Sequence, residues 1–98
     1  MEYVIRFHPF VAHQIAGWAL SDYLIVELHL ALREELGASP LQFLHRDPGG
    51  GPGGLYALQR VDPTSPRFRH IFLFRVFFDE DEKHLHVVRG SYWRVLSL

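Results

Sequence analysis

The chain contains no cysteine, and this absence excludes several kinds of protein at once. Without thiols it has no disulfide scaffold, no cysteine-ligated metal site and no cysteine nucleophile. The absence is typical of proteins in a reducing cytoplasm, which is where we expect this one to be. Hydrophobic side chains must then hold the fold, and they make up 48% of the 98 residues. This length and composition predict a single domain over residues 1–98.

Long uninterrupted apolar runs are also missing. Asp22 and Glu27 break the most apolar segment, residues 10–32, so it is a poor membrane span. Arg6 and His8 interrupt the apolar N-terminus before the hydrophobic stretch of a secretory signal is complete. We therefore expect a soluble protein with no membrane partner.

A large excess of one charge sign is absent as well, since the formal net charge is −1. The charge is nevertheless unevenly distributed along the chain. Residues 1–53 hold three basic and six acidic residues, whereas residues 54–98 hold seven basic and five acidic residues. Four of the later acidic residues lie together at 79–82, so the rest of the C-terminal half is basic. A basic patch indicates a polyanionic partner, although proteins dedicated to nucleic acids are usually strongly basic overall.

These basic residues belong to the stretch that organises the chain, Arg67–Tyr92, which we predict to be one β-hairpin. Because successive strand residues point to opposite faces, its first arm has an aromatic face and an arginine-bearing face. We expect the aromatic face to form the core. It carries Phe68, His70, Phe72, Phe74, Val76 and Phe78, and the other face carries Arg67, Arg69, Ile71, Leu73, Arg75 and Phe77.

A tight turn centred on residues 80 and 81 sets the predicted register of this hairpin. It places Arg75 opposite His86 and keeps the histidines of the second arm away from the aromatic core. Alternation places Arg89 on the opposite face from these histidines, but near the strand end its side chain could reach around the sheet edge. The predicted exposed face carries Arg67, Arg69, Arg75, His84 and His86.

Upstream of the hairpin, the sequence predicts one strand and a first helix. Residues 3–7 alternate and are rich in β-formers, which favours a strand. Pro9 suits the first turn of a helix over residues 10–18. We expect that helix to contact the core through Phe10, Ile15 and Trp18.

A second helix is predicted from a cap at Ser21 or Asp22 to about Leu36. Gly37 is in position to end it as the residue after the C-cap. The stripe that should face the core, at helical spacing, is Leu24, Leu28, Ala31 and Leu32.

Glycine and proline dominate the segment from about residue 46 to 54, and we interpret it as a flexible connector. It lacks the lysine and the hydroxyl residue of a phosphate-binding Walker loop. A strand over residues 55–61 and a turn over residues 62–66 are predicted to follow. The predicted order is β-α-α-β-β-β, an α+β fold with an antiparallel sheet and both N-terminal helices packed on one of its faces.

Two segments resemble a known superfamily, the RelE/ParE-type toxins of type II toxin–antitoxin and plasmid stabilisation systems. Residues 3–17, YVIRFHPFVAHQIAG, are similar to its opening strand and helix, and residues 67–94, RFRHIFLFRVFFDEDEKHLHVVRGSYWR, to its terminal strands. The resemblance implies a cognate antitoxin as partner, and it leaves self-association open. It also implies a target, because RelE-like toxins cleave mRNA at the ribosome and ParE-like toxins act on DNA gyrase.

A RelE-like activity would use the arginine-bearing face as its active site. Such a site cleaves RNA without a metal ion or cofactor if it offers a base for the 2′-hydroxyl, cations for the phosphorane charge and an acid for the leaving 5′ oxygen. Histidine suits proton transfer at neutral pH, arginine binds phosphate bidentately, and tyrosine stacks on bases. The catalytic residues that the resemblance implies are Arg69, Arg75, His86, Arg89 and Tyr92.

Other interpretations of the same residues stay open. The fold could serve as a non-enzymatic binding module, either a ParE-like gyrase inhibitor or an inactive relative. The arginines could be solvated or paired with the acidic residues at 79–82, and Tyr92 could be core packing. His84 and His86 would share a strand face, as metal ligands do, but no third ligand stands at a suitable spacing. We therefore predict no metal site.

Overall fold

The computed structural model of the protein describes residues 3–46 and 53–96. The predicted α+β class is confirmed, with a four-stranded sheet and three α-helices among these residues. No helix in this part of the chain is long and apolar enough to cross a membrane. In chain order the elements are β1 (Val4–Phe7), α1 (Pro9–Gly17), α2 (Asp22–Ala31), the π-helical turn η1 (Leu32–Gly37), α3 (Pro40–Phe43), β2 (Gly53–Val61), β3 (Phe68–Asp79) and β4 (His84–Leu96).

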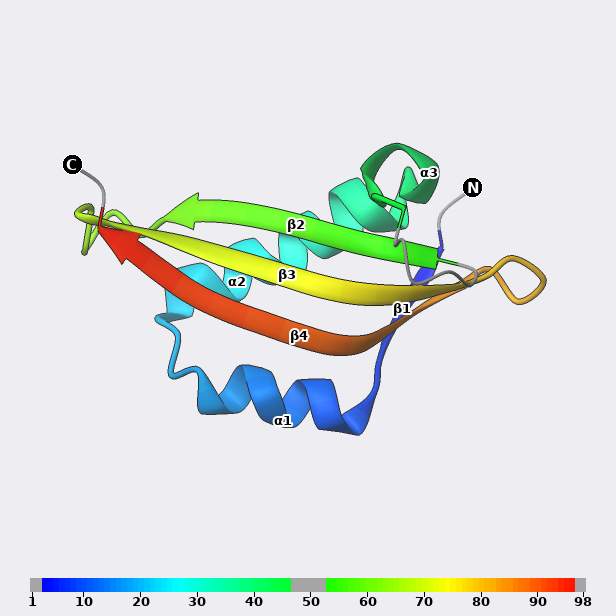
Figure 1. The fold of residues 1–98 in the computed structure, drawn as a ribbon, viewed down its shortest axis with the longest axis horizontal. Helices are drawn as coiled ribbons and strands as arrows, with labels where there is room; N and C mark the ends of the chain where they lie inside the picture. Colours follow the sequence, from blue (N-terminus) through cyan, green and yellow to red (C-terminus); the bar gives the residue numbers. More distant parts are fainter. Residues whose placement is uncertain (1–2, 47–52, 97–98) are drawn as a thin grey trace.

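The strands of the sheet lie in the order β1-β4-β3-β2 (Figure 1). The pairs β2–β3 and β3–β4 are antiparallel, but β1 runs parallel to β4 at one edge of the sheet. The prediction of a wholly antiparallel sheet is therefore wrong. Parallel neighbours need a long connection, and here most of the chain lies between the two strands. The local pattern of residues 3–7 carries no information on such a distant partner.

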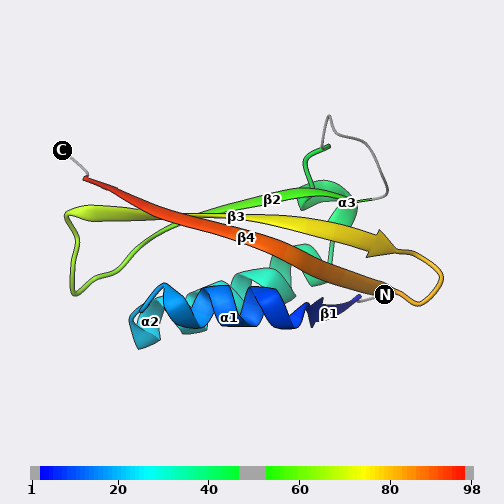
Figure 2. The same ribbon diagram turned by 60° about the horizontal axis from the view of Figure 1, so that its bottom comes forward.

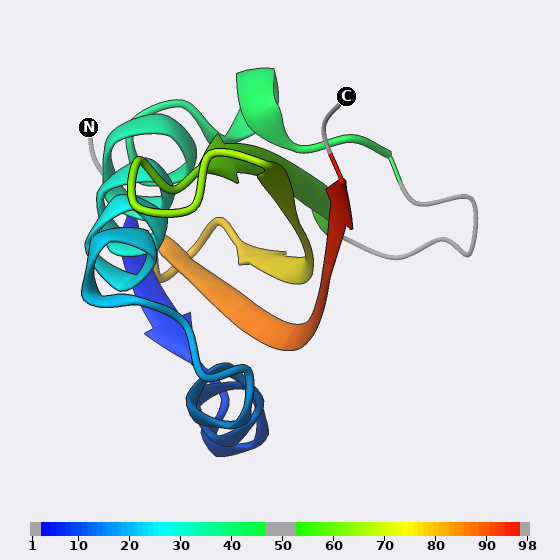
Figure 3. The same ribbon diagram turned by 90° about the vertical axis from the view of Figure 1, so that its left-hand side faces the viewer.

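The helices α1 and α2 lie on the same face of the sheet, as predicted (Figures 2 and 3). The core lies between them and the sheet. The predicted helical stripe is buried, since Leu24, Leu28, Ala31 and Leu32 are at most 4% exposed. The buried strand residues that meet it are Tyr56, Leu58, His70, Phe72, Phe74, Val76, Leu85 and Val87. Phe72, Phe74 and Val76 of the predicted aromatic face therefore form the core as predicted, whereas Phe68 and Phe78 at its ends are only half-buried.

The helix α1 begins one residue earlier than predicted and presents a different side chain to the core. The His8 imidazole caps it, because its Nδ1 accepts a hydrogen bond from the Phe10 N–H at 3.1 Å. Pro9 is the first helical residue. Val11 and Ile15, one turn apart, are buried, whereas Phe10 is 53% exposed. The prediction that Phe10 contacts the core is wrong.

The helix α2 starts as predicted but ends differently. The Ser21 hydroxyl accepts a hydrogen bond from the Leu24 N–H at 3.3 Å and so caps the helix. At its other end the helix continues into η1, of which Gly37 is the last residue. The Gly37 carbonyl accepts a hydrogen bond from the Tyr3 N–H at 2.8 Å.

The connector was predicted over about residues 46–54, but β2 begins before that segment ends. Gly53 and Gly54 already belong to β2, where they pair with Phe77 and Val76. Residues 47–52 of the connector lie outside the described residues.

The hairpin of β3 and β4 turns through residues 80–83 and pairs Phe77 with His86. The predicted register, with Arg75 opposite His86, is therefore wrong by two residues. Lys83 adopts a left-handed backbone with φ of 56° and closes a turn wider than the predicted one. A shift of two residues leaves each side chain on its face, because the side-chain period of a strand is two. The residues that share the predicted exposed face are accordingly Arg69, Arg75, His84 and His86.

A β-bulge changes the parity of the second half of β4. The pairing shifts between Arg75 and Val76, so that Arg75 pairs with Arg89 and Val88 is an extra residue in the ladder. Beyond the bulge, Arg89 lies on the face of Arg75 and Tyr92 turns toward the helices. The predicted parity of Arg89 is therefore wrong.

Candidate nucleic-acid interface

The sheet face that looks away from α1 and α2 is called here the open face (Figure 2). Alternation, the strand registers and the bulge together assign its residues. On β1, β3 and β4 it presents Val4, Arg6, Arg69, Ile71, Leu73, Arg75, Phe77, Asp79, His84, His86, Arg89, Ser91, Trp93 and Val95.

A group of cations from three strands gathers on this face. Arg6 on β1 pairs with His86 on β4, and His86 pairs with Phe77 on β3, so these side chains form one row. At the next outward position of β3, Arg75 lies directly opposite Arg89. Side chains in such cross-strand pairs have their Cβ atoms about 5 Å apart. We call Arg6, Arg75, Arg89 and His86 the arginine cluster.

The electrostatics of the cluster suit an anionic ligand. Like charges directly opposite each other destabilise a sheet, and Arg75 and Arg89 form such a pair. Within residues 3–46 and 53–96, Arg6 and Arg89 form no ion pair with a carboxylate. A bound phosphate would bring negative charge to the cluster, and the planar guanidinium forks fit its oxygen atoms.

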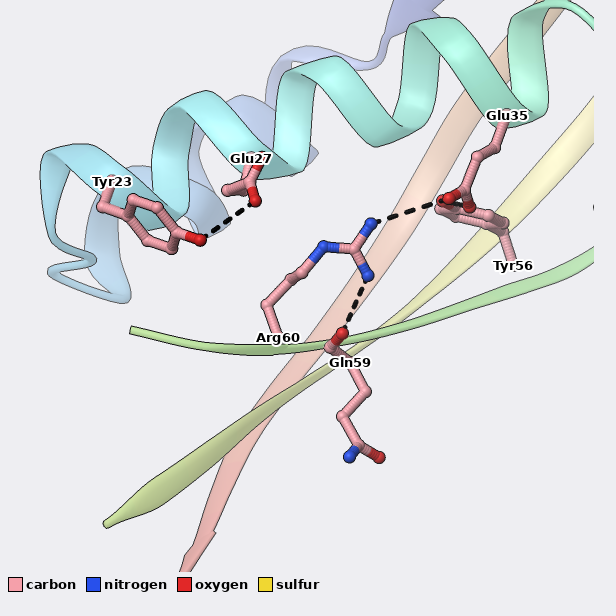
Figure 4. Close-up of polar contacts among 6 residues, drawn as sticks. All are labelled: Tyr23, Glu27, Glu35, Tyr56, Gln59 and Arg60. Atoms are coloured by element: carbon pink, nitrogen blue, oxygen red, sulfur yellow. Dashed lines mark hydrogen bonds and ion pairs between the residues drawn. The ribbon is translucent and has the colours of Figure 1, made fainter. Parts of the chain in front are cut away.

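The strand β2 adds no cation to the open face. Arg60 lies on its helix side, where Nη2 is 3.6 Å from Glu35 Oε2 (Figure 4). The Tyr56 hydroxyl donates to Glu35 Oε1 at 2.8 Å, and burial together with this bond raises the pKa of Tyr56. Arg60 thus belongs to a contact between sheet and helix. The open-face positions of β2 are uncharged, namely Leu55, Ala57, Gln59 and Val61.

Two aromatic side chains lie exposed on the open face. Phe77, in the row of His86, is 47% exposed, and Trp93, farther along β4, is 45% exposed. Trp93 pairs with Ile71, which is six positions from Phe77, or about 20 Å at the rise of a strand. Exposed rings beside cations are the pattern by which proteins bind single-stranded nucleic acids, because every base has a face that stacks.

The structure divides the five predicted site residues into three places. Arg75, His86 and Arg89 lie together in the arginine cluster. Arg69 shares the open face but is six positions from Arg75 along β3, about 20 Å away. Tyr92 lies on the helix side of the sheet, because the bulge reverses the parity of that part of β4.

Tyr92 makes its polar contact in the interior. Its hydroxyl is 2.7 Å from His70 Nδ1, and the two rings stack with centroids 5.9 Å apart. Burial raises the pKa of Tyr92 and lowers that of His70, so both groups stay neutral near pH 7. The open face therefore lacks the tyrosine that the resemblance assigns to it.

Arg6 and the exposed aromatic rings are functional candidates that the sequence interpretation did not select. Alternation within residues 3–7 already separates Arg6 from Ile5 and Phe7, so its face could be predicted. Its neighbour could not, since the parallel pairing with β4 joins distant parts of the chain. Phe77 was placed on the arginine-bearing face but given no role, and Trp93 was interpreted as packing because hydrophobicity alone does not tell the two faces of a sheet apart.

No family model matches this chain, and comparisons with curated proteins and with solved structures also give no match. The candidate site consequently rests on its own geometry.

The arrangement offers phosphate binding and proton transfer. Among the described residues, no three histidine or acidic side chains are grouped so as to hold a metal ion. The cluster supplies guanidinium groups for a phosphate and an imidazole next to them. Those are the side chains that a metal-independent cleavage of RNA needs.

Proposed function

We propose that this protein is a toxin of the RelE/ParE type that binds RNA on its open face and cleaves it, as RelE-like toxins do with mRNA at the ribosome. The observation that carries the proposal is the arginine cluster. Arg6, Arg75 and Arg89 come from three strands, and the strand pairings bring them to the same region of the open face as His86. The order of one strand, two helices and three strands also supports it, because the resemblance implies that order.

In the proposed mechanism the scissile phosphate lies between Arg75 and Arg89. Their N–H groups stabilise the negative charge that develops on the phosphorane. His86 transfers a proton from the 2′-hydroxyl or to the leaving 5′ oxygen, for which an imidazole is suited at neutral pH. Phe77, next to His86 across the strands, stacks on a base and holds the strand in register.

A second candidate function is a binding module on the same fold, either a gyrase inhibitor of the ParE kind or an inactive relative. The observation that favours it is the position of Tyr92 on the helix side. The tyrosine among the catalytic residues that the resemblance implies is then missing from the open face. His84, whose ring centroid is 5.8 Å from that of His86, remains as a second proton-transfer group.

Cleavage of mRNA in a reconstituted translation system, mapped by primer extension, tests the first candidate. His86→Ala should slow cleavage by about 100-fold, because it removes proton transfer. Arg75→Ala should slow it by about 100-fold or more, since it removes charge stabilisation at the phosphate. Arg33→Gln, an exposed change in η1 on the helix side, is the matched control and should keep the wild-type rate.

The same preparations should be assayed for inhibition of gyrase supercoiling and for growth arrest on expression. Growth arrest that both alanine variants leave intact would contradict the nuclease proposal. Intact mRNA together with inhibited supercoiling would establish the second candidate instead.

A further inference from the structure

A hollow of about 470 Å³ opens on the helix side of the sheet, away from the arginine cluster. It lies where the turn between α1 and α2 meets the turn between β2 and β3 and the last part of β4. It lies apart from the proposed RNA site and borders the hydrophobic core, against which Trp18 and Tyr92 of its lining pack. Its lining includes Trp18, Ser21, Asp62, His70, Tyr92 and Arg94.

One wall of the hollow is aromatic. Tyr92 stacks on His70 with an interplanar angle of 4°. Trp18 lies against Tyr92, with ring centroids 5.4 Å apart and a tilt of 35°. Trp18, His70 and Tyr92 line the hollow with aromatic rings, which favours a flat ligand over an aliphatic one.

His70 brings an unused hydrogen-bonding atom to this wall. The residue is 6% exposed, and its Nε2 is buried without a partner among the described residues. Its Nδ1 bonds the Tyr92 hydroxyl, and this contact allows either tautomer. Nε2 is therefore a donor or an acceptor, and a buried polar atom left unpaired in either state destabilises the fold.

The two charges of the hollow differ in how far they are satisfied. The Asp62 carboxylate is 3% exposed and accepts hydrogen bonds from the Ser21 hydroxyl at 2.6 Å and from the Thr64 N–H and hydroxyl at 2.9 and 2.8 Å. Arg94 is exposed, its guanidinium stacks over the Phe68 ring at 4.6 Å, and it forms no ion pair in the described part of the chain. The hollow thus holds a satisfied anion inside and an available cation at its rim.

We propose that this hollow binds a nucleoside monophosphate unit, with the base against the aromatic wall and the phosphate on Arg94. The edge of a base carries donors and acceptors side by side, so it satisfies His70 Nε2 in either tautomer once the imidazole turns toward the hollow. The guanidinium of Arg94 fits two phosphate oxygens. A purely apolar ligand would leave both groups unpaired, and the volume lies within the range of small-molecule pockets.

The unit can come from a free nucleotide or from an RNA strand. β1 pairs with β4 only at residues 84–87, and Gln14 of α1 accepts a hydrogen bond from the Gly90 N–H, so a strand on the open face can cross the edge of β4 beyond Gly90 toward the hollow. The RNA source rests on the proposed function, whereas binding of a free nucleotide does not.

Fluorescence titration tests the proposal directly. The chain has two tryptophans, so Trp93→Phe leaves Trp18, in the wall of the hollow, as the single reporter. Titration with 5′-AMP, GMP, CMP and UMP should give saturable quenching by at least one of them, and inorganic phosphate should not quench. In the same background Arg94→Gln should weaken binding about tenfold or more. Arg94 is exposed, so this change spares the core, and Arg33→Gln should leave the affinity unchanged.

Tetranucleotide RNA distinguishes the two sources. Tighter binding than the mononucleotide, lost in Arg89→Ala, assigns the hollow to an RNA strand, and equal binding assigns it to free nucleotides. The proposal is overturned if none of the four nucleotides gives saturable quenching, or if Arg94→Gln leaves the nucleotide affinity unchanged. A protein that cleaves mRNA without binding nucleotides overturns this inference alone, and a protein that binds nucleotides without cleaving overturns the proposed function alone.

Discussion

At the scale of single residues, Asp62 links two turns that are far apart in the sequence. Its carboxylate accepts hydrogen bonds from Ser21 and Thr64, and these bonds hold its pKa below the ordinary value. Ser21 also caps α2 through the Leu24 N–H. Asp62 therefore joins the turn after β2 to the start of a helix and fixes one side of the hollow.

Asp62→Asn should lower the free energy of unfolding at pH 7, and the difference from the wild type should shrink in acid. The sign follows from linkage, because a carboxylate with a depressed folded pKa stabilises the fold above its unfolded pKa of about 3.9. That contribution is lost as the pH falls through the lower folded pKa. Urea unfolding of both proteins at neutral pH and at about pH 3 measures it.

The control for this change is Asp81→Asn, at an exposed position in the turn between β3 and β4. It should alter the free energy of unfolding by less than about 0.5 kcal/mol. A difference between Asp62→Asn and the wild type that stays the same from neutral to acid pH would refute the role given to the carboxylate.

At the scale of elements, the bulge in β4 decides which residues form the open face. Val88 is the extra residue, so its deletion should leave the later residues of β4 on their present faces. Deletion of Ser91 beyond the bulge should instead turn either Arg89 or residues 92–96 to the wrong face. We expect the second deletion to cost at least about 2 kcal/mol more than the first, because it either buries Arg89 or takes Tyr92 away from the buried His70.

Chemical denaturation of the two deletion variants, followed by Trp fluorescence, measures the difference. Both variants lose one residue from the same strand, so each serves as the control of the other. Equal losses in the free energy of unfolding would mean that the bulge does not set the faces of β4.

At the scale of the whole molecule, a near-neutral chain presents a basic face. The formal net charge is −1, while Arg6, Arg69, Arg75 and Arg89 all lie on the open face. If three or four of them contact phosphates, the logarithm of RNA affinity should fall with the logarithm of salt concentration with a slope of about −2 to −3. Fluorescence anisotropy of a labelled single-stranded RNA between low and physiological salt gives this slope.

Replacing Arg6, Arg75 and Arg89 together by Gln should make the slope shallower, with a magnitude below about 1. The loss of RNA affinity should be largest at low salt. A steep slope retained in the triple variant would place the RNA elsewhere on the molecule. Arg33→Gln again controls for the loss of one charge outside the open face.

The sequence predicted much of this fold because local patterns carry it. Alternation in β3 separated the buried Phe72 and Phe74 from Arg69 and Arg75, and a polar cap placed the start of α2 at Ser21. These features depend on neighbours within a few residues. Phe10 was predicted wrongly because Val11, one turn before Ile15, shares the buried face, and Phe10 lies about 100° from Val11 around the helix.

By itself, then, the sequence determined the α+β class, the aromatic core and the face on which Arg75 and His86 lie, since each follows from periodicity along one element. Only the tertiary structure decided the parallel pairing that brings Arg6 to His86, the bulge that turns Arg89 outward and the burial of Tyr92 against His70. The physical reason is that pairing between distant strands and a one-residue shift in a ladder depend on how whole elements pack, and no residue type in the strand itself specifies them.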